Sequence, residues 1–166
     1  MSTRFYTKCS TPIGSLFIVS YENHIVAIYL GEADLYNEED MAIVDYMPED
    51  PLLNEAENQL NEYFRGERKE FDLPLSQQGT EFRMSVWDVL AKIPYGETRS
   101  YQNVAEAVGN PKAVRAIGQA NKANKLPIII PCHRVIGKNQ SLTGYAGTRT
   151  DIKEKLLALE GAHFNN

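Results

Sequence analysis

Hydrophobic and polar residues alternate along the first thirty residues, in the pattern that paired β-strands show. Glycine, proline and short polar pairs interrupt the alternation where tight turns are expected. We therefore predict three antiparallel strands and two turns, with the strands at residues 5–9, 16–20 and 25–30 and the turns at Thr11-Pro12-Ile13-Gly14 and Glu22-Asn23. Residues 31–50 are acidic without clear periodicity, and we expect a surface connection there.

The following hydrophobic residues recur at helical spacing. Asp50 is a suitable helix cap, Pro51 suits the first helical position, and Gly66 marks an end. The apolar positions of this helix are Leu53, Ala56, Leu60 and Phe64. We expect the helix to cover one face of the sheet.

Helical spacing dominates after residue 79, where the charge also changes, so we predict two domains, residues 1–78 and 79–166. Thr80 can cap a helix that runs through about Lys92. Its apolar stripe comprises Phe82, Val86, Val89 and Leu90, with Trp87 beside it.

Two short helices are predicted next, joined by a tight turn in the manner of a helix-turn-helix. Ser100 caps the first, which ends at Gly109, and Asn110 and Pro111 begin the second. At 100° per residue, Arg115 falls on the outer face of the second helix. The outer face also carries Gln119 and Lys122, and the inner face carries Ala113, Ala116, Ile117 and Ala120. Many helical hairpins show this pattern without binding nucleic acid. On the basic half of the chain, such a slim helix suits entry into a DNA groove, with Arg115 as a candidate to fill the space of an extruded base.

The aliphatic run at residues 128–130 lies between two prolines and predicts a buried strand that ends at Pro131. Cys132 then lies where a core element meets a pocket. The adjacent His133 and Arg134 can lower the pKa of a thiol towards neutrality, which favours a nucleophile over a merely buried cysteine. His133 can equally be a core imidazole, since neighbouring residues often point in opposite directions.

Charge is distributed unevenly along the chain. Residues 1–79 contain five Lys and Arg against fifteen Asp and Glu, whereas residues 80–150 contain ten against four. The net charge of −5 therefore hides a basic second half that is suited to binding phosphate. A chance imbalance on a solvated surface is the alternative.

Other features restrict the class of protein. The chain lacks an apolar stretch long enough to span a bilayer and a secretory signal, so we expect no membrane association and a location in the cytoplasm, or in the nucleus of a eukaryote. Cys9 and Cys132 are expected to be free thiols, with Cys9 structural. No CxxC or HxxxH spacing supports a metal site. We expect a monomer.

The segment Ile130-Pro131-Cys132-His133-Arg134-Val135 resembles the active-site motif of the O6-alkylguanine-DNA alkyltransferases, also called methylated-DNA-protein-cysteine methyltransferases. The resemblance covers about residues 79–161, through GTEFRMSVW, IPYGETRSY, GNPKAVRAIGQA, GYAG and LLALEG, in the family's order and spacing. The first 75 residues match loosely, through the TPIG hairpin, and lack the zinc ligands of some relatives.

This resemblance implies an α+β fold, in which a small ribonuclease-H-like α/β domain precedes a mainly helical, winged-helix-like domain with a helix-turn-helix. It implies DNA repair by direct reversal. The protein would bind duplex DNA through the minor groove, flip an alkylated guanine into a pocket and transfer the alkyl group irreversibly to Cys132, without a cofactor. Activity on O4-methylthymine stays open.

The resemblance also implies roles for individual residues. Arg115 would be the finger that replaces the flipped base, and Tyr101 would donate a hydrogen bond to the guanine ring. His133 would deprotonate Cys132 through a water, and Glu160 would orient His133. Asn124 would brace the turn before the cysteine, and further DNA or substrate contacts would come from Ser100, Gln102, Ala113, Gly118, Pro127, Val135, Tyr145 and Ala146.

One departure from the family pattern follows Gly147, where Thr148-Arg149 replaces the Gly-Leu of many members. This change bears on how the loop closes and on the size of the alkyl group that fits.

Two other functions remain open. One is a non-catalytic binder of alkylated DNA, which the presence of Cys132 disfavours. The other is a cysteine hydrolase that uses Cys132 and His133, for which no oxyanion hole is evident.

Overall fold

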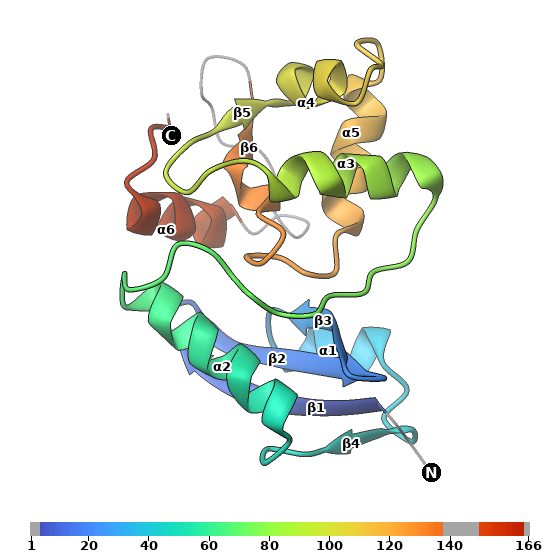
Figure 1. Cartoon of the computed structure of the whole chain (residues 1–166), viewed down its shortest axis with the longest axis vertical. Coiled ribbons are helices and arrows are strands. Elements are labelled where there is room, and N and C mark those ends of the chain that lie inside the picture. The colour runs from blue at the N-terminus through green and yellow to red at the C-terminus, as the bar shows by residue number, and fades with distance from the viewer. Residues whose placement is uncertain (1–3, 138–149, 165–166) are drawn as a thin grey trace. The chain divides into compact units, whose positions relative to one another are not determined.

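The chain folds into two units, Met1–Gln77 and Gln78–Asn166, each of which is described separately below. The computed structural model describes residues 4–137 and 150–164 (Figure 1). Within these residues, none of the helices combines the length and hydrophobicity needed to cross a bilayer.

Four strands form the sheet of the N-terminal unit, in the order β3-β2-β1-β4. They are β1 (Arg4–Thr11), β2 (Gly14–Tyr21), β3 (His24–Tyr29) and β4 (Val44–Tyr46). The first three pair antiparallel, which confirms the predicted hairpins. Glu22 and Asn23 have φ of 49° and 63°, the left-handed conformation that a two-residue turn needs to match the twist of its strands.

The expected surface connection at residues 31–50 is wrong, because this segment contains helix α1 (Glu32–Glu38) and strand β4. Helix α1 buries only Leu35, so its sequence shows almost no apolar periodicity. Strand β4 is three residues long and pairs parallel with β1. Its position therefore depends on a partner strand about forty residues away in the sequence, which local patterns do not report.

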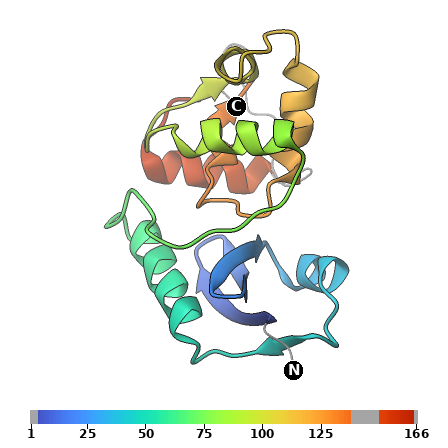
Figure 2. The ribbon, with the colours of Figure 1, turned by 45° about the vertical axis from the view of Figure 1, so that its right-hand side comes forward.

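Helices cover both faces of this sheet. Phe17 and Val19 of β2 pack with Leu35 of α1, so the alternating side chains of β2 at residues 16 and 18 point to the other face. Cys9 is paired with residue 16 in the β1–β2 register, and its thiol contacts Asn61 at 3.7 Å. Asn61 belongs to helix α2 (Pro51–Phe64), which begins at the predicted Asp50 cap. Figure 2 shows the sheet between the two helices.

The C-terminal unit is mainly helical, as predicted. Its elements are α3 (Glu81–Ala91), β5 (Arg99–Ser100), α4 (Tyr101–Ala107), α5 (Val114–Ala123), the 3-10 helix η1 (Cys132–Arg134), β6 (Val135–Ile136) and α6 (Thr150–Glu160). Thr80 caps α3, which is confirmed. Trp87 is buried, where the sequence placed it beside the apolar stripe, and its indole nitrogen donates to the carbonyl of Ala120 at 2.9 Å. This bond fastens α3 to α5.

Helix α4 and its predicted ends are confirmed. Ser100 and Asn103 form a reciprocal capping box at the start of the helix. At the end, Gly109 has φ of 82°, and the amide of Asn110 donates to the carbonyl of Ala105 at 2.9 Å. This is a Schellman motif, which requires the left-handed conformation that glycine adopts easily.

Helix α5 begins three residues later than predicted. The segment after Asn110 forms a turn, in which the amide of Ala113 donates to the carbonyl of Asn110 at 3.0 Å, and the first helical residue is Val114. The inner face also differs from the prediction. Ile117 and Ala120 are buried as expected, but Ala116 is exposed. Asn121 takes a place in the buried face, where its amide has a specific partner described below.

Candidate active site

The segment before Cys132 is a buried turn, so the predicted strand is wrong. Ile128 has φ of 75°, and the amide of Ile130 donates to the carbonyl of Leu126 at 2.8 Å. Pro131 adopts φ −80° and ψ 67°, the geometry of an inverse γ-turn, and the amide of Cys132 donates to the carbonyl of Ile130 at 2.8 Å. A short apolar run indicates burial, and it does not by itself select an extended backbone.

Cys132 is the first residue of η1 and has only 4% of its surface exposed. The chain continues directly into β6, whose Val135 pairs with Arg99 of β5. The cysteine is therefore held between a rigid turn and a short parallel sheet. This placement agrees with the predicted position at the edge of the core, although the element that provides it is different.

Two asparagines at the end of α5 hold the turn and the cysteine. The amide group of Asn124 donates to the carbonyl of Ile130 at 2.9 Å, and its oxygen accepts from the amide of Leu126 at 3.0 Å. Asn121 donates to the carbonyl of Cys132 at 3.3 Å. The predicted contact of Asn124 with the turn is therefore present. Asn121 was not anticipated, although an amide at a position on the apolar face of a helix is a signal for a buried hydrogen bond.

Burial raises the pKa of the Cys132 thiol to about 11, against the lowering effects of a hydrogen bond with Asn124 and of the positive charge of Lys153. The sequence-based expectation that His133 and Arg134 bring this pKa towards neutrality is wrong. The guanidinium of Arg134 instead donates to the carbonyl of Ile93 at 2.6 Å and to a carboxylate. The thiol is therefore largely protonated at neutral pH and needs a base to become a nucleophile.

His133, Arg134 and Glu160 form a buried cluster. The carboxylate of Glu160 contacts His133 Nε2 at 2.7 Å and accepts from Arg134 Nε at 2.8 Å and Nη2 at 3.1 Å. Burial raises the pKa of Glu160, but these hydrogen bonds and charges outweigh it and hold the pKa at about 2. The guanidinium also lies 5.7 Å from the centre of the Tyr95 ring. The predicted contact between His133 and Glu160 is thus present, with Arg134 as an unforeseen third member.

The pKa of His133 is lowered, because full burial disfavours its charged form more than Glu160 favours it. His133 therefore stays neutral at neutral pH, and Arg134 supplies the permanent charge opposite Glu160. A neutral imidazole that faces a carboxylate through Nε2 carries its proton there. Its buried Nδ1 is then the basic nitrogen.

Lys153 on α6 is a buried lysine beside Val135 that the sequence does not predict. Its side chain is fully buried, and its ammonium group donates to the carbonyl of Val135 at 2.5 Å. Ile152, Leu156 and Leu157 of the same helix are also buried. A lysine one turn before two leucines on the apolar face was the available signal, because lysine is rarely fully buried without a specific reason.

The predicted DNA-contact residues lie along α4 and α5. Arg115 is exposed on the first turn of α5, six residues before Asn121. About 9 Å along the helix axis therefore separates Arg115 from Asn121, the residue that binds the carbonyl of Cys132. Tyr101 is the first residue of α4 and is half-buried. Four more predicted contact residues lie nearby. Ser100 caps α4, and the side-chain amide of Gln102 donates to the carbonyl of residue 111 at 3.0 Å. Ala113 and Gly118 are half-buried.

An added methyl group at Gly118 would meet nothing within 4 Å, which fits a slim helix surface. Of the predicted pocket residues, Pro127 and Val135 are buried beside the cysteine turn. Tyr145 and Ala146, and the departure at Thr148-Arg149, lie outside the described residues.

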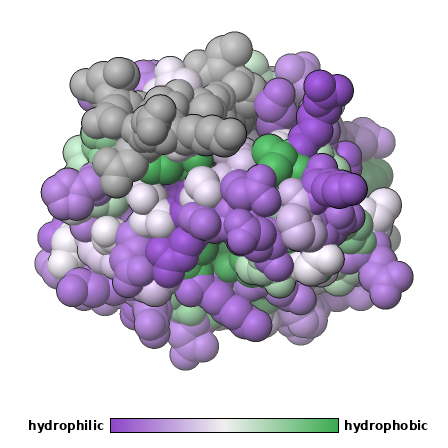
Figure 3. All heavy atoms as spheres, turned by 90° about the horizontal axis from the view of Figure 1, so that it is seen from above, coloured by the Kyte–Doolittle hydropathy of each residue, from purple (hydrophilic) through white to green (hydrophobic). Residues whose placement is uncertain are grey.

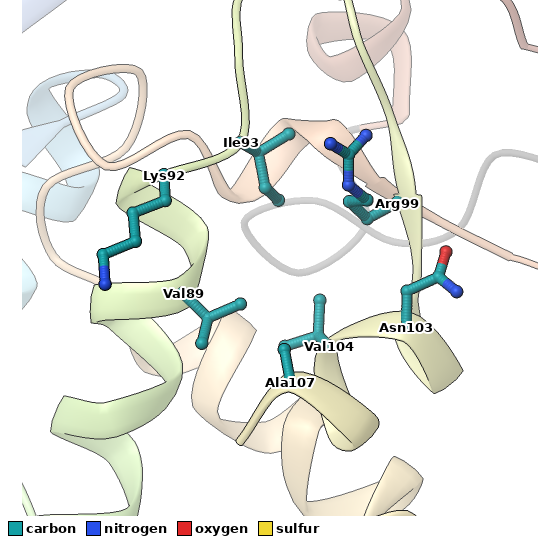
Figure 4. A pocket seen from close by; sticks show the side chains of 7 residues that line it. All are labelled: Val89, Lys92, Ile93, Arg99, Asn103, Val104 and Ala107. Atoms are coloured by element: carbon teal, nitrogen blue, oxygen red, sulfur yellow. The ribbon is translucent and has the colours of Figure 1, made fainter. Parts of the chain in front are cut away.

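A cavity of about 620 Å³ lies between α3 and α4 in the C-terminal unit (Figure 4). Apolar side chains and a polar rim line it: Val89, Lys92, Ile93, Arg99, Asn103, Val104 and Ala107. None of these is a predicted site residue.

In the view of Figure 3, the surface is mostly hydrophilic, with separate hydrophobic spots. Among residues 4–137 and 150–164, no three His, Cys, Asp or Glu residues gather in a way that suits a metal ion.

Two protein-family descriptions match the chain. Residues 4–77 match the ribonuclease-like domain of 6-O-methylguanine DNA methyltransferase, and residues 81–162 match its DNA-binding domain. These ranges correspond to the two structural units.

Similar proteins extend over nearly the whole chain. The constitutive methylated-DNA–protein-cysteine methyltransferase of Bacillus subtilis is 54% identical over 94% of this chain and 94% of its own length. The enzyme of the same name from Methanosarcina acetivorans is 44% identical over 95% of this chain and 99% of its own. The crystal structure of Mycobacterium tuberculosis OGT in complex with DNA superposes with a TM-score of 0.85, at 40% identity, over 95% of this chain and 92% of that one. The chain therefore belongs to the 6-O-methylguanine DNA methyltransferase family.

Proposed function

We propose that this protein repairs alkylated DNA by moving the alkyl group from the O6 oxygen of guanine onto its own Cys132, once per molecule. The observation that carries this proposal is the buried Cys132 at a turn whose carbonyls Asn124 and Asn121 bind, followed directly in the chain by a His133 that is hydrogen-bonded to Glu160. A buried thiol at a fixed turn suits a single displacement on carbon.

The C-terminal unit binds DNA, since it corresponds to the family's DNA-binding domain. We place the minor groove of the duplex against α5, with Arg115 filling the space of the flipped guanine. The exposed position of Arg115 and the excess of basic residues in positions 80–150 support this orientation. Ser100, Gln102, Ala113 and Gly118 would then lie along the groove. The N-terminal unit is assigned a structural role.

The chemistry begins with a proton transfer. His133 Nδ1 accepts the proton of Cys132 through one water molecule, while Glu160 fixes the ring through Nε2. The thiolate then attacks the alkyl carbon, the S–C bond forms as the C–O bond breaks, and the electron pair passes to guanine. Tyr101 donates a hydrogen bond to the ring as this charge develops. The guanine takes up one proton in place of its alkyl group. In the net reaction, the thiol therefore loses one proton and gains one alkyl group.

The direct test is to incubate the protein with a duplex oligonucleotide containing O6-methylguanine and to measure intact mass and a peptide map. We expect a gain of at most one methyl group per chain, on Cys132, with none in Cys132→Ser. Binding without modification would instead assign the chain to the non-catalytic binders. Repeated turnover, with more oligonucleotide demethylated than protein present, would instead indicate a hydrolase.

A second test addresses base flipping. We expect Arg115→Ala to slow methyl transfer from duplex DNA at least about tenfold more than transfer from the free base O6-methylguanine, because only the duplex requires the finger. Arg83→Ala is the matched control, since Arg83 is an exposed arginine on a different helix of the same unit. Equal losses on both substrates would remove the flipping role.

A further inference from the structure

The N-terminal unit carries a group of aromatic and aliphatic side chains that lie outside its core. Among the described residues, the most exposed large hydrophobic side chains are those of Tyr36, Ile43 and Tyr46, at 54%, 56% and 55%. A single exposed hydrophobic residue is normal at a protein surface. Three of them close together in the chain are not, and tyrosine is one of the residues enriched in protein interfaces.

These side chains lie around the edge strand of the sheet. β4 is that edge strand (Figure 1), and the ring of Tyr46 lies 5.3 Å from the ring of Tyr6 on β1. Tyr6 and Met41 both pack against the buried cluster between the sheet and α1. The pKa of Tyr36 is raised mainly by a hydrogen bond to Glu32 and further by the charge of Tyr6, so the two tyrosines lie near each other. We call Tyr6, Tyr36, Met41, Ile43 and Tyr46 the tyrosine surface.

The segment that forms most of the tyrosine surface is strongly acidic. Residues 31–50 contain eight Asp and Glu and neither Lys nor Arg. Six of these acids are exposed: Glu32, Asp34, Glu38, Asp40, Asp45 and Glu49. On β1, Arg4 is neutralised by the buried Glu39, which leaves Lys8 against the six exposed carboxylates. The surface is therefore apolar at its centre and negative around it.

This charge restricts what can cover the surface. Phosphates of nucleic acid and anionic lipid headgroups are repelled by carboxylates, so a DNA groove and a membrane both have the wrong charge. A protein segment with apolar residues on one side and lysines or arginines beside them is complementary, because it covers the rings and pairs with the carboxylates. Proteins that bind DNA carry basic segments of this kind.

We propose that the tyrosine surface is a docking site for a basic amphipathic segment of another protein. This surface lies in a different structural unit from Cys132, and the inference does not depend on the proposed function. Apolar contact with the rings would supply most of the affinity, and the carboxylates would select a basic partner and speed its association.

The test uses the full-length protein and three synthetic peptides. The first carries lysine and leucine on opposite faces of a helix, the second contains the same residues in scrambled order, and the third has glutamate in place of lysine. Fluorescence anisotropy of the labelled peptide measures affinity, and amide chemical shifts of the nitrogen-15-labelled protein locate the site. We expect the first peptide to bind with a Kd on the order of 10 µM, at least about tenfold more tightly than the others. It should shift the amides of Tyr6 and of residues 31–50.

Two double variants separate the apolar from the electrostatic contribution. Tyr36→Ser with Tyr46→Ser removes two exposed rings, and Asp34→Asn with Asp45→Asn removes two exposed charges. We expect each double variant to weaken binding of the first peptide at least about fivefold. Added salt should weaken the binding that remains in the tyrosine variant more than the binding that remains in the aspartate variant.

Met84→Ser and Asp88→Asn are the matched controls, because both residues are exposed on α3 of the other unit. Both should bind the first peptide as the wild type does. Methyl transfer from O6-methylguanine DNA should be unchanged in the two double variants, since their residues lie outside the site around Cys132.

Two results with the peptides would overturn the proposal. Equal affinities of the first and the scrambled peptide, or an unchanged affinity in the tyrosine variant, would reduce the interaction to net charge. Chemical shifts confined to residues outside the tyrosine surface and residues 31–50 would place the peptide elsewhere. This second measurement uses the wild-type protein and therefore holds even if a variant does not fold.

The other possible occupants are tested on the same surface. Duplex DNA and phosphatidylglycerol vesicles are titrated into the labelled protein, and sedimentation equilibrium measures self-association. We expect no shifts at residues 31–50 from DNA or vesicles, and no dimer that the tyrosine variant abolishes. Shifts there from DNA or vesicles, or loss of a dimer in that variant, would assign the surface to nucleic acid, a membrane or a second copy and overturn the proposal.

Discussion

Replacing Glu160 by glutamine tests the buried cluster, because it removes one charge and almost no volume. The carboxylate accepts three hydrogen bonds of 2.7–3.1 Å from His133 and Arg134. In Glu160→Gln, the buried guanidinium loses its counter-charge, and the amide can serve fewer donors. We expect a substantial loss of stability in the C-terminal unit.

The lowered pKa of Glu160 gives the size of the expected loss in the free energy of unfolding. Its reduction from 4.5 to about 2 corresponds to about 3 kcal/mol, at 1.36 kcal/mol per pKa unit. This agrees with the loss of about 3–5 kcal/mol expected when one partner of a buried pair is removed. Because the folded-state pKa is the lower one, the stabilisation is complete above about pH 5 and disappears as the pH falls towards 2. The glutamine variant should lack that part of the acid sensitivity.

Urea unfolding followed by tryptophan fluorescence is the assay, since Trp87, the single tryptophan, is buried in the C-terminal unit. Glu97→Gln is the matched control, because Glu97 pairs with Arg99 at 3.0 Å at the surface of the same unit, where such pairs contribute less than about 1 kcal/mol. Equal stabilities of wild type and Glu160→Gln at pH 7, or equal losses on acidification, would refute the reasoning.

Three further predictions concern local contacts. Gly79→Ala should cost about 1–3 kcal/mol and shift the emission of Trp87, because the new methyl group would lie 2.6 Å from the ring; unchanged emission and urea midpoint would contradict this. Asn124→Ala should raise the pKa of Cys132 further, since a hydrogen bond that favours the thiolate is lost; an unshifted pH profile of iodoacetamide modification would exclude that role. Ser100→Ala should lower the free energy of unfolding in urea by about 1 kcal/mol, and Ser100→Asp by much less, because a carboxylate can still accept from the amide of Asn103. Equal losses of stability in the two variants would show that the cap is unimportant.

Elements with strong local signals were predictable from the sequence. The hairpin at Glu22-Asn23, the Asp50 cap of α2 and the Gly109 end of α4 all depend on residues within one turn of each other. Elements that depend on distant partners were not. Strand β4 exists through its pairing with β1, and the apolar segment at residues 128–130 is folded by asparagine hydrogen bonds rather than by strand pairing.

The candidate site shows the same division. The sequence located Cys132 and, through the family motifs, its relation to His133, Glu160 and Asn124. The lowered thiol pKa that the adjacent His133 and Arg134 predict is wrong, because both side chains bind Glu160. The side chain of Arg134 binds Glu160, twenty-six residues away in the sequence. The positive charge that lowers the pKa of Cys132 belongs to Lys153, and burial outweighs it.

The amino-acid sequence is enough to predict the residue types of the reaction, the two-part organisation and the local geometry of caps and turns, because these follow from covalent structure and short-range hydrogen bonding. Three properties depend instead on packing: the protonation state of the thiol, the neutrality of His133 and the pairing of Arg134 with Glu160. Burial and the distances between charges set these properties, and both arise when α5, η1 and α6 pack together.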